Sequence, residues 1–325
     1  MTVRETAIVP RSTEYLLSPT PPPAKKRTRA SRQNFWIYAF LLPTFLLYGA
    51  YTIYPILASY WYSFVEWNGF SSEQRFVGIE NYQAVLADPM FWSSVRITLV
   101  FMILVAPLRV FLSLLVAFAL NSPRMPFAPL LRTVFFIPVV TTTAIVGVVM
   151  QFIFDPGSGP VNAILRALGV TGVDLLGSSP SALFTVAAVY IWKSFGITMI
   201  YWLAALQTIP SDLYEAARID GAGPMKLLRH ITFPMLIPFF IIIFVLTIEE
   251  TFRAFDLVLT MTGGGPFFST EIIEIYIYRW AFAASVPQLG IASAAAVAFG
   301  VIVLVVGIAQ LWVTIAARKM QKGLS

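Results

Sequence analysis

Side chains that could perform acid–base, nucleophilic or metal chemistry are scarce in this 325-residue chain. It contains no cysteine and a single histidine, His230, so thiolate sites and multi-histidine metal sites are excluded. An enzyme acting inside a membrane would need carboxylates or histidines that converge from different segments. The available carboxylates, Glu249, Glu250 and Asp256, all belong to one apolar segment. We therefore expect no catalytic residue, no metal and no cofactor.

Several ionisable residues lie inside apolar segments, where a buried charge is costly and usually paired or functional. They are Arg109, Lys193, Glu249, Glu250, Arg253 and Asp256. In a helix, Glu249, Arg253 and Asp256 are spaced i, i+4 and i+7, so they would share one face and could pair. Two interpretations stay open: a salt-bridge ladder that orients the segment, or the lining of an aqueous substrate path. Lys193 could likewise pair with these carboxylates or meet a polar substrate.

The composition places most of the chain in lipid. Hydrophobic residues make up 58% and charged residues 12% of the sequence, and the mean hydropathy is +0.77. A soluble domain of this length would need a larger charged surface. A helix needs about 20 apolar residues to cross a bilayer, and six segments qualify: 35–63, 94–120, 130–154, 182–206, 235–260 and 289–316. We expect an all-α polytopic membrane protein, with a kink or an interfacial extension in the first segment, which contains Pro43 and Pro55.

The charge distribution predicts the topology. The formal charge of +6 is concentrated next to apolar segments, as the positive-inside rule predicts, so we expect no nucleic-acid partner. Basic residues favour the cytoplasm for both termini and for residues 210–234. We expect a disordered basic cytoplasmic tail over 1–34, the first transmembrane helix and an outer loop over 35–93, a five-helix core over 94–316, and a second cytoplasmic tail over 317–325.

Residues 210–234 form a polar insert between the fourth and fifth apolar segments. Ser211 can cap a helix, Gly221 can end it, and Pro224 suits the first turn of a second short helix. Pro234 then marks the entry to the fifth segment. Glu215 offers a fixed charge, and the alanines after it allow close backbone approach. The insert fits either a knob that docks into another protein or an amphipathic loop on the membrane surface.

A glycine-rich loop follows the fifth segment. Gly263, Gly264, Gly265 and Pro266 predict a tight turn at its outer end. We expect this turn to be structural, and contact with a docked protein is the alternative.

The polar insert also contains a spaced motif. The motif consists of Glu215, Ala216 and Ala217, then three residues and Gly221, then nine residues and Ile231-x-x-Pro234. It resembles the coupling loop of permease subunits from ATP-binding-cassette (ABC) importers, with Phe233 where leucine is usual. Residues 75–101, 188–210 and 252–282 resemble carbohydrate-uptake permeases of the maltose/glycerol-phosphate type, specifically the first of two non-identical permeases.

The resemblance implies a fold, a mechanism and partners. The fold would be that of a type I ABC importer permease, with six transmembrane helices in a bacterial-type cytoplasmic membrane. The chain would form half of an alternating-access path for a sugar or sugar-like solute and would not itself hydrolyse ATP. Its partners would be a second homologous permease, nucleotide-binding ATPase subunits and an extracytoplasmic solute-binding protein. Coupling to the ATPase would involve Glu215, Ala216, Ala217, Asp220, Gly221, Ile231 and Pro234.

Two other transporter classes stay open. An importer permease for a polyamine, an amino acid or phosphate would use the same insert. An ATP-independent secondary transporter would often show two related halves, and it would leave the polar insert without a role.

Overall fold

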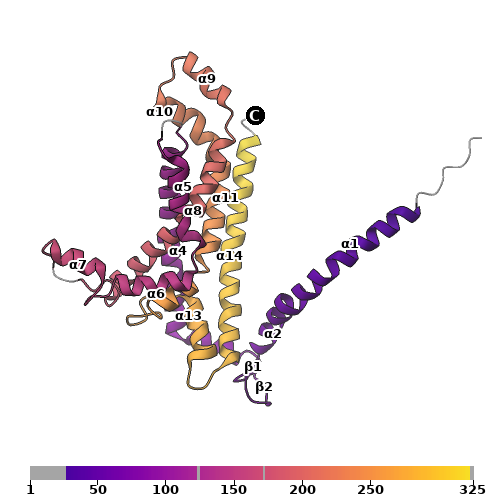
Figure 1. The fold of residues 1–325 in the computed structure, drawn as a ribbon. Coiled ribbons are helices and arrows are strands. Elements are labelled where there is room, and N and C mark those ends of the chain that lie inside the picture. Colours follow the sequence, from indigo (N-terminus) through magenta and orange to yellow (C-terminus); the bar gives the residue numbers. More distant parts are fainter. Residues whose placement is uncertain (1–26, 123–124, 171–172, 323–325) are drawn as a thin grey trace, which may run out of the picture. The chain divides into compact units, whose positions relative to one another are not determined.

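A computed structural model describes residues 27–122, 125–170 and 173–322, and most of them are helical (Figure 1). The α-helices are α1 (Arg27–Tyr48), α2 (Tyr54–Tyr62), α3 (Glu80–Ala87), α4 (Pro89–Leu120), α5 (Ala128–Val140), α6 (Thr143–Ile153), α7 (Pro160–Ala167), α8 (Ser179–Gln207), α9 (Ser211–Ile219), α10 (Pro224–Leu227), α11 (Phe233–Thr251), α12 (Phe255–Met261), α13 (Ile273–Tyr278) and α14 (Leu289–Lys322). The same described residues also form the π-helical segments η1 (Gly49–Ile53), η2 (Leu228–Thr232) and η3 (Arg279–Ala283). The chain divides into two units, residues 1–57 and 58–325, which we describe separately.

The first unit is dominated by α1. The helix begins at Arg27, so residues 27–34 are helical rather than part of the expected disordered tail; arginine, serine, alanine and glutamine can all continue a helix. Residues 1–26, the rest of that tail, lie outside the described residues. The irregularity expected near the two prolines occurs at η1. Pro55 has no N–H to offer the preceding turn, and the Tyr54 N–H bonds the Gly49 carbonyl five residues back.

The second unit is a helical bundle centred on α4 and α8. Trp202 on α8 is fully buried, and its indole nitrogen donates to the Val110 carbonyl of α4 over 3.1 Å. On the other side of α8, Gly196 lies so close to α5 that a Cβ atom there would overlap the Phe135 carbonyl oxygen. Small residues at such crossings let membrane helices approach closely. These contacts hold α4, α5 and α8 together as a packed group.

Hydropathy predicted six continuous spans, and two of them are broken. Among the described residues, five helices are long and apolar enough to cross a membrane, and a sixth crossing exists only if α5 and α6, which are bent by 98°, count as one span. Pro138 cannot donate to the preceding turn, and Thr141 then adopts an extended conformation that ends α5. The break falls inside the expected span 130–154.

The expected fifth span, 235–260, is also broken. It ends as α11 at Thr251 and resumes as α12 at Phe255. Thr247 and Thr251 donate their hydroxyls to carbonyls four residues back, each over 2.7 Å, a pattern that bends helices. The Arg253 N–H then bonds the Glu250 carbonyl in a tighter, three-residue turn. In contrast, α14 continues past the expected end at 316 to Lys322.

The two ends of the bundle differ in structure (Figure 1). One end carries α9 and α10, together with the C-terminal end of α14. The opposite end carries α13 and a two-stranded antiparallel hairpin, β1 (Val65–Glu66) and β2 (Arg75–Phe76), in which Val65 pairs with Phe76. Asn81 of α3 fastens the hairpin, because its side-chain nitrogen donates to the Ser63 and Val65 carbonyls over 3.0 Å each. The polar insert and the C-terminal helix end therefore lie on the same side of the bundle.

The α5–α8 contact predicts a stability difference between two glycines. Gly196→Ala should destabilise the chain by about 1–3 kcal/mol, because the added methyl group forces two backbones apart. Gly300 on α14 has no atom within 4 Å of its added Cβ, so Gly300→Ala is the matched control and should leave stability nearly unchanged. The thermal unfolding midpoints of the two purified variants in one detergent measure the difference. Equal midpoints would show that α5 and α8 are not in close contact at Gly196.

Candidate functional site

The polar insert begins with α9, which presents small and charged side chains at the end of the bundle. Pro210 occupies the capping position, and Ser211 is already helical, so the expected Ser211 cap is wrong. Its hydroxyl donates instead to the Asp212 carboxylate over 3.3 Å. Asp212 lies in the first turn, where the helix dipole favours a negative charge. Glu215 and Ala216 are exposed on the same helix.

Gly221 ends α9 as predicted. Its φ of +77° lies in the left-handed region, which glycine adopts at little cost. The Gly221 N–H bonds the Arg218 carbonyl over 3.0 Å, and the Ala222 N–H bonds the Ala217 carbonyl over 2.9 Å. This pair of hydrogen bonds is the Schellman motif, which satisfies carbonyls that the helix end leaves free. The reversal after α9 is therefore fixed by backbone geometry.

The second half of the insert is not a separate helix. From Pro224 the chain is helical without interruption through α10, η2 and α11 to Thr251. Pro234 has no N–H to donate. The preceding Phe233 N–H bonds the Leu228 carbonyl five residues back, so the helix accommodates the proline with a π-helical turn. The expected boundary at Pro234 is thus a change of helix type. A displacement of α10 can pass directly along one helix to Thr251.

The motif residues divide into an exposed set and a packed set. Ile231 packs against the bundle core beside Tyr214, and the Tyr214 and Thr232 hydroxyls are 3.0 Å apart, which ties α9 to η2. A hollow of about 390 Å³ lies between α9 and the α10–η2 segment. It is lined by Ala217, Ala222, Lys226, Leu227, His230 and Ile231. Glu215, Ala216 and Asp220 face away from the core as exposed residues. The structure therefore brings Ala217 and Ile231 together. Glu215, Ala216 and Asp220 stay exposed and available to a partner.

Four large apolar side chains of the insert are exposed, and two of them stand out. Ile219 is 87% exposed and Met225 is 73% exposed. Both flank the Gly221 turn. Sequence analysis missed them, although an isoleucine at the end of an otherwise polar helix was a usable signal. Exposed apolar residues beside polar ones are typical of a protein–protein contact.

A second group of charges lies inside the bundle. Arg109 of α4 is completely buried, and its Nη2 is 2.5 Å from Oε2 of Glu250 on α11, whose side chain is 35% exposed. The Tyr190 hydroxyl of α8 donates to the Glu250 carbonyl over 2.6 Å. Three helices thus meet at Glu250. Sequence analysis identified both charged residues but not Tyr190, since a tyrosine in an apolar segment gives no specific signal.

The remaining charges of the spans are arranged differently from the prediction. Glu249 and Arg253 form an ion pair on the exposed surface of the bundle, as their spacing predicted. Asp256 does not extend that row, because the helix ends at Thr251 and Asp256 belongs to α12. Lys193 is half-buried and within electrostatic range of Arg109 and Glu250, but it forms no ion pair with any residue that the structure describes.

The glycine-rich loop is a turn, as predicted. Gly263 and Gly264 have φ values of +60° and +89°, and the Thr270 hydroxyl closes the loop by donating to the Gly265 carbonyl over 2.7 Å. Phe267 at its tip is 88% exposed, whereas Pro266 borders a small hollow against Asp155 and neighbouring residues.

A buried carboxylate, which sequence analysis missed, supports this loop. Glu271 is fully buried, and Arg279 Nη2 lies 2.8 Å from its Oε2. The Cζ atom of Arg279 lies 4.6 Å from the centre of the Phe268 ring. Burial raises the pKa of Glu271, and the Arg279 guanidinium opposes that rise. Nearby on α13, burial raises the pKa of Glu274 to about 7.

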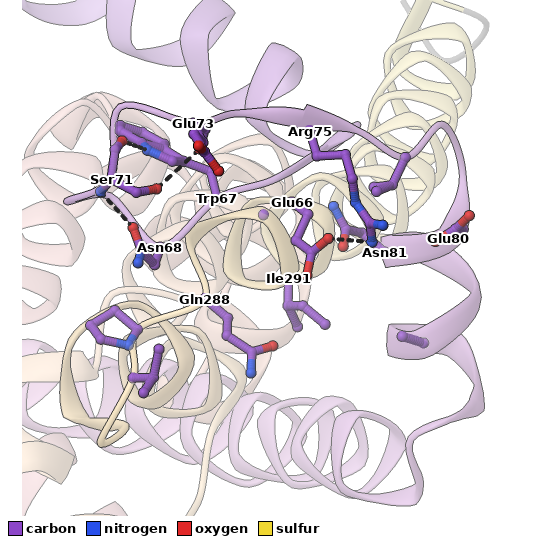
Figure 2. Close-up of a pocket in the computed structure, with 15 residues that line it drawn as sticks. Glu66, Trp67, Asn68, Ser71, Glu73, Arg75, Glu80, Asn81, Gln288 and Ile291 are labelled. Atoms are coloured by element: carbon purple, nitrogen blue, oxygen red, sulfur yellow. Dashed lines mark hydrogen bonds and ion pairs between the residues drawn. The ribbon is translucent and has the colours of Figure 1, made fainter.

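An open groove occupies the same end of the bundle (Figure 2). It has a volume of about 720 Å³ and lies between the β1–β2 hairpin, α3 and the start of α14. Its polar lining includes Glu66, Trp67, Asn68, Ser71, Glu73, Arg75, Glu80, Asn81 and Gln288. The hairpin wall is held by local bonds: Trp67 donates to the Ser71 carbonyl over 2.8 Å, and Arg75 pairs with Glu66. Its charged side chains are mostly acidic, so the groove offers many hydrogen-bond acceptors.

Comparison with known proteins gives one consistent family. The family described as "Binding-protein-dependent transport system inner membrane component" matches residues 82–319. The chain is 33% identical over 267 residues to the trehalose/maltose transport system permease protein MalF of Thermococcus litoralis, covering 82% of this chain and 89% of that protein. It is 31% identical over 294 residues to the sn-glycerol-3-phosphate transport system permease protein UgpA of Pectobacterium atrosepticum, covering 89% and 96% respectively.

A solved structure shares the fold. A chain of a bacterial alginate ABC transporter, in complex with an alginate pentasaccharide-bound periplasmic protein, superposes with a TM-score of 0.76 at 22% identity, covering 87% of this chain and 94% of that chain. The helical bundle, the polar insert and these matches agree. The chain belongs to the binding-protein-dependent transport system inner membrane component family of ABC transporter permeases.

Proposed function

We propose that this chain forms half of the translocation path for a sugar or sugar-like solute in an ABC importer, and that it couples to a separate ATPase through residues 210–234. The observation that carries the proposal is the exposed surface of the insert. Ile219 and Met225 present apolar surface on the insert that also carries the exposed Glu215, and Pro224–Thr251 links the insert to the spans through one continuous helix. An ATPase cleft that covers Ile219 could therefore move α11.

The insert would then face the cytoplasm, where ATP is available. The C-terminal end of α14 lies at the same end of the bundle (Figure 1), in agreement with the basic residues of both segments and the positive-inside rule. The C-terminus would then be cytoplasmic, and the basic residues of the N-terminal segment favour the same side for the N-terminus. The hairpin, α13, the glycine-rich loop and the groove of Figure 2 would face the outside.

The solute path would run along the charged face of α11. Glu249 and Arg253 are exposed within the chain, and an exposed ion pair at this depth is unfavourable against lipid. A second homologous permease packed against this face would enclose it in an aqueous path. Lys193 and the exposed part of Glu250 would lie beside that path and could hydrogen-bond a hydroxyl-rich solute.

The relatives' names favour a sugar over other solute classes. They describe permeases for trehalose and maltose and for sn-glycerol-3-phosphate. A solute-binding protein would deliver the solute at the outer end, where Phe267 is exposed and the groove of Figure 2 is open. A polyamine, an amino acid or phosphate would instead be indicated if the binding protein that co-purifies with the chain retained such a compound.

The turn at Gly221 gives a first prediction. Gly221→Val should loosen the insert, because a β-branched residue in the left-handed region is strained by roughly 1–2 kcal/mol. Trypsin cleavage at Arg218, Lys226 and Arg229 in permeabilised membranes should become about tenfold faster if opening limits cleavage. Gly221→Asn is the control, since asparagine tolerates this conformation, and it should be cleaved nearly as slowly as the unmodified chain. Equal cleavage of the valine and asparagine variants would contradict the described turn.

The charge of α9 gives a second prediction. Glu215→Lys reverses a charge at the proposed docking surface, so much less ATPase should co-elute with this variant than with the unmodified chain. Glu73→Lys, the same reversal in the groove of Figure 2 at the other end of the bundle, should retain the ATPase. Quantitative mass spectrometry of the complexes purified in a mild detergent measures both. Full retention of the ATPase by Glu215→Lys would show that Glu215 is not at the contact.

A further inference from the structure

The buried position of Arg109 needs an explanation beyond a place along the solute path. Its side chain has no exposed surface, and a charge in such a site is tolerated only when it is paired. Its partner, Glu250, is 141 residues away in the sequence. The pair therefore joins two separate helices, α4 and α11, at one point.

That point is the break in the fifth span. Glu250 is the second-last residue of α11, and α12 does not begin until Phe255. The Glu250 carbonyl accepts both the Tyr190 hydroxyl and the Arg253 N–H. Arg109 and Tyr190 thus hold the side chain and the backbone of the same residue.

The two helices that hold Glu250 are fixed to each other. Trp202 of α8 donates to the carbonyl of Val110, the residue after Arg109, and the ring centres of Phe101 on α4 and Tyr190 on α8 are 5.6 Å apart. Beyond the break, Ala254 is buried in one cluster with Leu257, Val258 and Val146 of α6. The same cluster includes Phe101 of α4 and Tyr190 of α8, so apolar packing holds the chain beyond the break, whereas the polar contacts of Glu250 hold the chain before it.

Only part of the hydrogen-bonding capacity of the Arg109 guanidinium is used in this arrangement. Its Nε and Nη1 are buried and have no hydrogen-bond partner among the described residues, although a guanidinium can hold a carboxylate through two parallel bonds. Unpaired buried donors cost free energy. If α11 shifted, acceptors on it could reach these two donors. Arg109 could therefore hold the end of α11 in more than one position.

We propose that Arg109 is a positioning residue that acts through Glu250, clamping the end of α11 so that the fifth span hinges at residues 252–254. With the clamp formed, Ala254 in the break stays buried and the Glu250 carboxylate has a defined place. The use of this hinge in transport rests on the proposed function. The clamp itself does not depend on it.

The natural absence of cysteine allows a clean test. Ala254, at the break, and Ala106, three residues before Arg109, are each 1% exposed, and each is replaced by cysteine in separate variants. The reaction of each full-length variant with N-ethylmaleimide in native membranes is followed by intact mass. The background is either unmodified or carries Arg109→Gln together with Glu250→Gln. The double change removes both charges at once, so neither is left buried and unpaired.

The proposal predicts that the cysteine at 254 reacts at least tenfold faster in the double-glutamine background, while the cysteine at 106 changes less than twofold. An acceleration below threefold at 254 would overturn the clamp. An equal acceleration at both cysteines would also overturn it, because the ion pair would then stabilise the bundle generally rather than the break. The labelling needs neither the ATPase nor the solute, so its result is separate from the test of coupling at Glu215.

Discussion

A buried arginine forms an ion pair that joins two main helices of this membrane bundle, α4 and α11. Water is scarce in such an interior, so a charge there must find its partner inside the protein. Arg109 finds it at Glu250, the point where the fifth span loses its helical hydrogen bonds. The carbonyl of the same residue receives the Tyr190 hydroxyl. Three helices are thereby joined at one residue.

The same span extends in the other direction to the polar insert. Because α10, η2 and α11 form one uninterrupted helix from Pro224 to Thr251, the Gly221 turn comes just before its start and the break at 252–254 comes just after its end. At the first end a Schellman motif fixes the reversal into α9. A force applied to α9 or α10 would therefore reach the charged residues near Glu250 without passing through a flexible loop.

The sequence was sufficient to predict the class of fold and the approximate spans. Long apolar runs directly indicate segments that lie in lipid. Gly221 indicated a left-handed turn, because few other residues adopt that conformation. Hydropathy did not show the breaks in the third and fifth spans, since an average over a long segment measures its apolar character and not whether its helix is continuous. Pro138 and the paired threonines were the local signals for those breaks.

The partners of the buried charges were less accessible to prediction. The i, i+4 spacing correctly paired Glu249 with Arg253, but the extension to Asp256 assumed a helix that had already ended. Arg109 and Glu250 are paired across helices, and a single sequence gives no measure of such distances. The exposure of Ile219 also depends on the tertiary placement of α9, which a periodicity argument does not supply.

The central claim is that the polar insert docks on an ATPase. A photoreactive amino acid in place of Ile219, activated in native membranes, tests it most directly when the adducts are identified by mass spectrometry. The account predicts a covalent adduct with a nucleotide-binding ATPase subunit. Adducts with lipid alone would contradict it and would show that the insert lies on the membrane surface.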